Sequence, residues 1–133
     1  MYRFVIELED FESLPREEQK AILRLNLEAL VRANRAYLEA HPDTPALYSA
    51  GVRYEKEPRG RDNWQNIPRT IALRSGDCED LASWRVAELQ QAGELTAHPD
   101  VLVYELPGEV DFHIVARRAD GSIEDPSRRL GMP

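Results

Sequence analysis

The segment Gly76-Asp77-Cys78-Glu79-Asp80-Leu81-Ala82 contains the only cysteine in the 133 residues. Asp77 is a favourable helix N-cap, and Asp80 resembles the acidic partner of a capping box, so Cys78 falls at the first helical position. Free N–H groups and the dipole at a helix N-terminus favour the thiolate, which attacks acyl carbons. The pattern predicts that Cys78 is a nucleophile, although a lone cysteine is more often an inert buried residue.

Acidic side chains beside Cys78 oppose its ionisation. Asp77, Glu79 and Asp80 are negative, and negative charge disfavours a thiolate, so the helix end alone is insufficient. A cationic partner is therefore needed. His113 is the candidate, because it lies in the middle of a segment whose apolar and β-branched residues predict a strand.

The turn after this strand decides whether an aspartate can orient the histidine. A two-residue loop would place Asp125 on the strand face opposite His113. A three-residue loop over 119–121, with Gly121 in the left-handed conformation, would pair Val115 with Asp125. His113 and Asp125 would then be diagonal neighbours on one face, within side-chain reach. The sequence Ala-Asp-Gly suits the three-residue turn, so a Cys-His-Asp triad is geometrically available.

The chemistry assigns a role to each member of this triad. Cys78 attacks an acyl carbon, and His113 removes the thiol proton and later protonates the leaving group. Asp125 fixes the tautomer of the imidazole and supports its positive charge.

A long loop at 41–66 supplies further candidates. The backbone N–H of Cys78 can be one oxyanion donor, and Gln65 or Trp64 is expected to supply the second. Tyr54 is expected to line the cleft with them. Each has an alternative role, since aromatic side chains commonly fill a core and a glutamine commonly lies in water.

Periodicity predicts the elements that position these groups. Strands are expected at 2–8, 52–55, 101–106, 110–117 and 122–125, and helices at 15–40, 67–74 and from 78 to about 93. The order predicts an α+β fold, with helices packed on one face of an antiparallel sheet, in a single domain over 1–133. The helix at 15–40 has two apolar stripes, which predict packing between other elements, with a partner-binding face as the alternative.

Composition excludes several classes of function. The net charge of −7 would repel a phosphate backbone, so no nucleic-acid partner is expected. A single cysteine excludes an internal disulfide, and the three histidines lack metal-ligand spacing, so neither a metal nor another cofactor is expected. No long apolar run is present, which predicts no membrane segment and a cytoplasmic protein.

The residues around Cys78 resemble the nucleophile motif of the transglutaminase-like cysteine peptidase superfamily, in which a strand histidine and then an aspartate follow the cysteine. The resemblance implies a papain-like α+β core and acyl-transfer chemistry: peptide hydrolysis, amide hydrolysis or transamidation. It implies Cys78, His113 and Asp125 as the catalytic residues. The chain lacks the additional β domains and calcium sites of larger members, which argues against protein cross-linking.

The second half of the chain is also similar to small proteins encoded among bacteriophage and prophage structural genes, through 64–89, 113–115, 120–121 and 123–132. Two functions follow as expectations. The first is a phage- or prophage-encoded cysteine peptidase or amidase, acting on a peptide or protein in the bacterial host cell. The second is a catalytically degenerate assembly or adaptor protein that binds phage structural proteins through the same scaffold.

Overall fold

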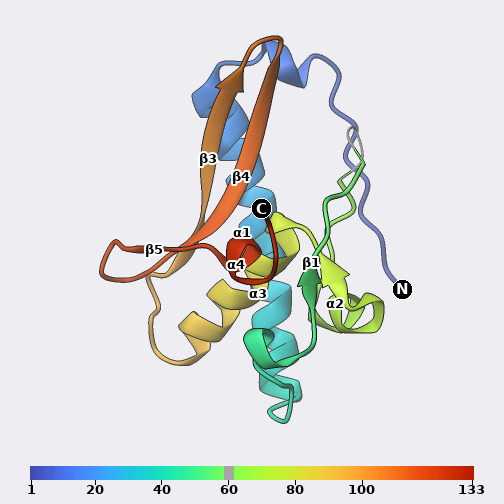
Figure 1. Cartoon of the computed structure of the whole chain (residues 1–133), viewed down its shortest axis with the longest axis vertical. Helices are drawn as coiled ribbons and strands as arrows, with labels where there is room; N and C mark the ends of the chain where they lie inside the picture. Colours follow the sequence, from blue (N-terminus) through green and yellow to red (C-terminus); the bar gives the residue numbers. More distant parts are fainter. Residues whose placement is uncertain (59–61) are drawn as a thin grey trace.

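The computed structural model describes residues 1–58 and 62–133 and has an α+β architecture (Figure 1). Its elements in chain order are η1 (Phe11–Ser13), α1 (Arg16–Ala40), η2 (Leu47–Ser49), β1 (Arg53–Tyr54), α2 (Ile67–Leu73), β2 (Ser75–Gly76), α3 (Cys78–Gln91), β3 (His98–Leu106), β4 (Glu109–Arg117), β5 (Ile123–Glu124) and α4 (Pro126–Arg129). Strands β3, β4 and β5 form an antiparallel sheet, and β1 pairs in parallel with β2.

Helix α3 lies at the centre of the core. It packs against α1, β4 and α4, and the Leu81 and Trp84 side chains are fully buried. Its N-terminus is held by the expected capping box: Asp80 N–H donates to Asp77 Oδ1, and Asp77 N–H donates to Asp80 Oδ2. The predicted helix start at Cys78 is therefore confirmed.

Helix α1 follows its predicted bounds but presents only one apolar stripe to the core. Leu27 and Val31 are buried against α3 and the sheet. In the second stripe, which is formed by Ile22, Leu25, Ala29, Ala33, Ala36 and Ala40, Leu25 is 68% exposed and the four alanines are exposed as well. The expectation of a helix packed between other elements is therefore wrong for the second stripe, because no described element covers it.

The predicted strand at 2–8 is wrong. Residues 1–8 have no regular secondary structure, and the side chains of Tyr2, Phe4, Ile6 and Leu8 are between 51% and 87% exposed. The segment runs along the outside of the molecule (Figure 1). An alternating sequence becomes a strand only where a neighbouring strand bonds to its backbone, and no described strand does so.

The turn between β4 and β5 has the predicted length. The last paired residues of β4 and β5 are Arg117 and Ile123. Next to them, Arg118 N–H donates to Ser122 O at 2.8 Å, which leaves three residues, 119–121, in the loop. Gly121 has φ 87°, in the left-handed region. Asp120 stabilises the turn by accepting hydrogen bonds from the N–H and the hydroxyl of Ser122. The three-residue register is therefore confirmed.

Gly121→Ala should destabilise the protein by about 1 kcal/mol, because a Cβ is unfavourable in the left-handed region. A Cβ here would meet nothing within 4 Å, so the cost belongs to the backbone alone. Urea unfolding measures it. Ala119→Ser in the same exposed turn is the control, expected within about 0.5 kcal/mol of wild type. Equal stability of all three proteins would contradict the assigned turn.

Candidate active site

His113 and Asp125 form the pair that the turn length predicts. The Nε2–H of His113 donates to Asp125 Oδ2 at 2.8 Å, and the histidine is only 6% exposed. The other carboxylate oxygen, Oδ1, accepts from Arg128 N–H as the N-cap of α4. Asp125 therefore fixes the imidazole with its proton on Nε2, and Nδ1 is the nitrogen with a free lone pair.

A polar network holds the chain just before Asp125. Glu124 accepts hydrogen bonds from the hydroxyl of Tyr48 and from the guanidinium groups of Arg85 and Arg118. These donors come from η2, from α3 and from the end of β4, so they tie three parts of the chain to β5. The network therefore fixes the position of the carboxylate that orients His113.

Cys78 lies against the edge of β4. Strand β5 pairs only with Ala116 and Arg117, so the β4 edge at Ile114 is not bonded to β5. The N-terminus of α3 occupies this place, and the backbone N–H of Ile114 hydrogen-bonds to the sulfur. The sulfur therefore lies beside the peptide group that joins His113 to Ile114.

The thiol is protonated in this arrangement. It donates to Glu79 Oε2 at 3.3 Å, and within the described residues no hydrogen bond joins Cys78 to His113. Burial raises the pKa of the Cys78 thiol, and the negative charges of Glu79 and Asp77 raise it further, while the Ile114 N–H lowers it. This structure therefore holds a neutral thiol rather than a thiolate paired with an imidazolium.

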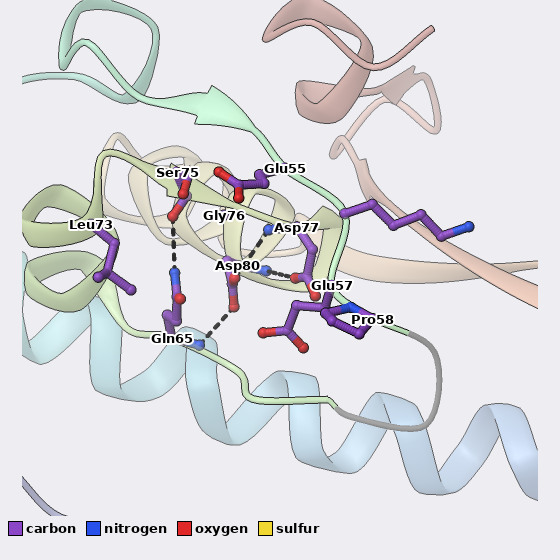
Figure 2. Close-up of a pocket in the computed structure, with 10 residues that line it drawn as sticks. Glu55, Glu57, Pro58, Gln65, Leu73, Ser75, Gly76, Asp77 and Asp80 are labelled. Atoms are coloured by element: carbon purple, nitrogen blue, oxygen red, sulfur yellow. Dashed lines mark hydrogen bonds between the residues drawn. The ribbon is translucent and has the colours of Figure 1, made fainter.

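The acidic residues of the motif are themselves buried. Burial, followed by the charge of Asp77, raises the pKa of both Glu79 and Asp80. Asp80 is partly compensated, because it accepts from the backbone N–H groups of Gln65 (2.6 Å) and Asp77 (3.1 Å), as Figure 2 shows. The N-terminus of α3 is therefore a site that retains protons.

Cys78 and His113 line a cleft of about 890 Å³. Tyr54 lines it, as expected from the sequence. The β3–β4 hairpin also contributes, through residues that include Glu105 and Asp111. These two were missed, although the two-residue spacing from Asp111 to His113 places both side chains on one strand face.

Gln65 and Trp64 are placed differently from the expectation. Gln65 lines a separate hollow of about 370 Å³, where its side-chain amide donates to Ser75 O at 3.0 Å (Figure 2). The same amide donates to Thr70 Oγ1 at 3.3 Å. The structure therefore does not bring Gln65 to the cysteine. Trp64 packs in the apolar cluster that contains Cys78, and its indole N–H is buried without a hydrogen-bond acceptor among the described residues.

Three carboxylates near the site could contact one cation. Glu57, Asp62 and Asp77 each offer an oxygen, and these oxygens lie within 4.8 Å of one another. Oxygen ligands of this kind suit hard cations such as Ca²⁺ or Mg²⁺. Acidic groups commonly cluster without an ion, so this geometry alone assigns no metal.

No protein-family model, curated protein or solved structure matches the chain. The transglutaminase-like resemblance therefore stays a prediction that rests on the motif and on the order of the three residues. Among the described helices, none has the length and apolar character needed to cross a bilayer.

Glu79→Gln should change how stability depends on pH. The folded state holds a proton on Glu79 above the pH at which the unfolded chain loses it, so the wild-type free energy of unfolding falls as pH rises from about 4. The protonated Glu79 side chain hydrogen-bonds to Asp77. Glutamine has no proton to lose, and its amide can donate to Asp77 in the same way. The variant should therefore be more stable than wild type by about 1 kcal/mol at pH 8 and similar near pH 4.

Chemical denaturation across this pH range measures the difference. Glu17→Gln, the same change at an exposed position of α1, is the control and should parallel wild type. Parallel curves for wild type and Glu79→Gln would show that Glu79 loses its proton equally in both states.

Proposed function

We propose that the chain is a cysteine-dependent acyl-transfer enzyme, a peptidase or amidase with a papain-like, transglutaminase-like core. One observation carries the proposal: the 2.8 Å hydrogen bond between His113 and Asp125, in the cleft that Cys78 also lines. A carboxylate on Nε2 leaves Nδ1 as the base, so one ring nitrogen is oriented and the other can take the thiol proton.

In this mechanism the sulfur leaves its hydrogen bond to Glu79 by rotation about the Cα–Cβ bond and turns to His113. His113 Nδ1 takes the thiol proton as sulfur bonds to the acyl carbon, and the carbonyl electrons move to oxygen. The Cys78 backbone N–H at the start of α3 donates to this oxyanion. The imidazolium then protonates the departing amine, which leaves a thioester, and water attacks the thioester with His113 again as base.

The Trp64 indole is the remaining candidate for a second oxyanion donor. Its N–H has no acceptor among the described residues, and its ring packs against the cluster that contains Cys78. Trp64 does not itself line the cleft, so its ring would have to turn toward the cleft to present this donor. The residue therefore keeps its predicted role in the proposal, whereas Gln65 is occupied by Thr70 and Ser75.

A second candidate function has its own observation. The hydrogen bond from Cys78 to Glu79, with the raised pKa of the thiol, favours a catalytically degenerate protein that keeps the scaffold. Such a protein would act as an assembly or adaptor protein for phage structural proteins, and the exposed stripe around Leu25 on α1 would be its contact surface. For both functions the proposed setting is the cytoplasm of a bacterial host.

Acylation by an activated ester separates the two functions. With p-nitrophenyl acetate, Cys78 should form one thioester per chain, detected by mass spectrometry. His113→Gln should slow acylation about 100-fold or more, because it removes the base. Asp125→Asn should slow it as well, and asparagine is equally suited to cap α4, so folding is retained.

His41→Gln, at an exposed histidine on the far end of α1, is the control and should acylate at the wild-type rate. Equal rates for wild type and His113→Gln would remove the triad and leave the adaptor function as the conclusion.

A further inference from the structure

The N-terminal segment has the sequence of a strand but no strand beside it. Phe4 and Ile6 lie on one side of the alternation in residues 2–8, and the large apolar side chains of residues 1–8 are between 51% and 87% exposed. No described strand bonds to this segment. An alternating segment of this kind forms a strand when it joins an unpaired sheet edge. The segment is therefore a candidate donor strand.

The edge of β4 beside the cleft is a matching acceptor. The N–H of Ile114 meets the Cys78 sulfur on the edge that β5 has left. Because successive residues of a strand direct their backbone groups to alternate edges, the N–H and C=O groups of Phe112 and Val110 point the same way. Both residues line the cleft, and within the described chain no backbone group bonds to them on this side.

The outer edge of β3, by contrast, is protected. Leu102 lies opposite His113 in the β3–β4 ladder, whose alternation directs the backbone groups of Pro99 and Val101 outward. Pro99 has no N–H, and the Asp100 carboxylate accepts a hydrogen bond from the Val101 N–H. Sheets block exposed edges in this way against pairing with another chain. The β4 edge keeps its N–H groups at positions 110 and 112.

We propose that residues 2–8 of one copy pair as a strand with β4 of a second copy, along the edge to which Val110 and Phe112 point, in a reciprocal exchange. None of residues 1–8 lines the cleft of its own chain, and the segment runs along the outside of the molecule (Figure 1). Because the donor and the acceptor lie on the same chain, a two-fold exchange pairs both segments at once and closes the assembly as a dimer.

The donor segment leaves from the rim of the acceptor cleft. Phe11 lines the cleft, and its ring centroid lies 6.3 Å from that of Phe112. The Phe11 carbonyl accepts a hydrogen bond from the side-chain amide of Gln19 at 2.7 Å. Asp10, with φ 58°, bends the chain where the segment begins. A two-fold axis beside this rim therefore brings each segment to the neighbouring cleft without any change in η1.

The two faces of the donor strand suit the two faces of β4. In the register that joins apolar to apolar, Phe4 and Ile6 extend the face of Phe112, which packs on the apolar cluster around Cys78. Arg3 then lies on the other face, which carries Asp111, so the charges are complementary. The cleft of about 890 Å³ has room for a short strand with its side chains.

The first test follows mass and thiol reactivity together, and it needs no catalysis. Ile114, which bonds to the sulfur, is two residues or about 7 Å along the strand from Phe112, so a seated segment shields Cys78. Light scattering of the full chain should change from one chain to two as the concentration rises. Alkylation of Cys78, the only cysteine, by iodoacetamide should slow in parallel.

Two results would overturn the proposal at this stage. One is the mass of a single chain at every concentration up to about 1 mM, where even weak complexes form. With slow alkylation throughout, that result would place the segment in the cleft of its own chain. The other is a dimer whose Cys78 reacts at the rate of the monomer, which would place the segment elsewhere.

Donor variants test the segment itself. Phe4→Ser with Ile6→Ser should weaken dimerisation about tenfold or more and restore fast alkylation. Leu25→Ser with Leu95→Ser removes two apolar side chains that are 68% and 69% exposed elsewhere, and this control should dimerise as wild type does. Equal weakening in both double variants would attribute the association to general hydrophobicity and overturn the proposal.

Acceptor variants test the edge. Val110→Pro removes an N–H that points to the cleft and leaves the β3–β4 ladder intact, so it should weaken dimerisation about tenfold or more. Val103→Pro makes the same change on the outer edge of β3, as Pro99 already does, and should dimerise as wild type does. Urea unfolding confirms that both variants fold. Equal dimerisation of the two proline variants would exclude the β4 edge, whatever the donor variants show.

Discussion

The site depends on one packing arrangement: the N-terminus of α3 against the edge of β4 at the point where β5 has ended. Because β5 pairs only with Ala116 and Arg117, the Ile114 N–H is left to the sulfur of Cys78. Asp125 directly follows this short strand, and its carboxylate therefore lies within hydrogen-bond distance of His113. A longer β5 would have bonded to Ile114 and closed the edge. The length of β5 therefore decides both whether a helix can approach and where the aspartate lies.

The electrostatics of this helix end are unusual because two opposing effects meet there. A helix N-terminus attracts negative charge, and the capping box of Asp77 and Asp80 uses that attraction. Burial disfavours the charge that the helix attracts, and it is the largest cause of the raised pKa of Cys78, Glu79 and Asp80. With Asp80 1% exposed and Glu79 8% exposed, burial prevails. The Cys78 thiol therefore stays protonated at this helix end.

Local rules predicted much of this site, and non-local contacts account for what they missed. The capping box and the three-residue turn depend on a few neighbouring residues, so the start of α3 and the His113–Asp125 pair followed from the sequence. The segment at 2–8 has the correct alternation but no described strand beside it. Gln65 has a suitable side chain, yet its partners Thr70 and Ser75 depend on the path of the loop. The hydrogen bond from the Cys78 thiol to Glu79 Oε2 depends on the side-chain rotamers of both residues, and sequence spacing does not specify rotamers.

The contacts of Asp125 bear on which function the scaffold serves. An N-cap needs one acceptor for the orphan N–H groups of its helix, and Oδ1 meets that need for α4 through Arg128. The hydrogen bond that Oδ2 accepts from His113 Nε2–H is additional, and it keeps a polar ring that is 6% exposed at a cleft wall. An apolar residue at 113 would pack there at a lower desolvation cost. An adaptor protein has no use for the oriented imidazole, whereas a cysteine nucleophile does, so the pair favours the enzyme over the degenerate scaffold.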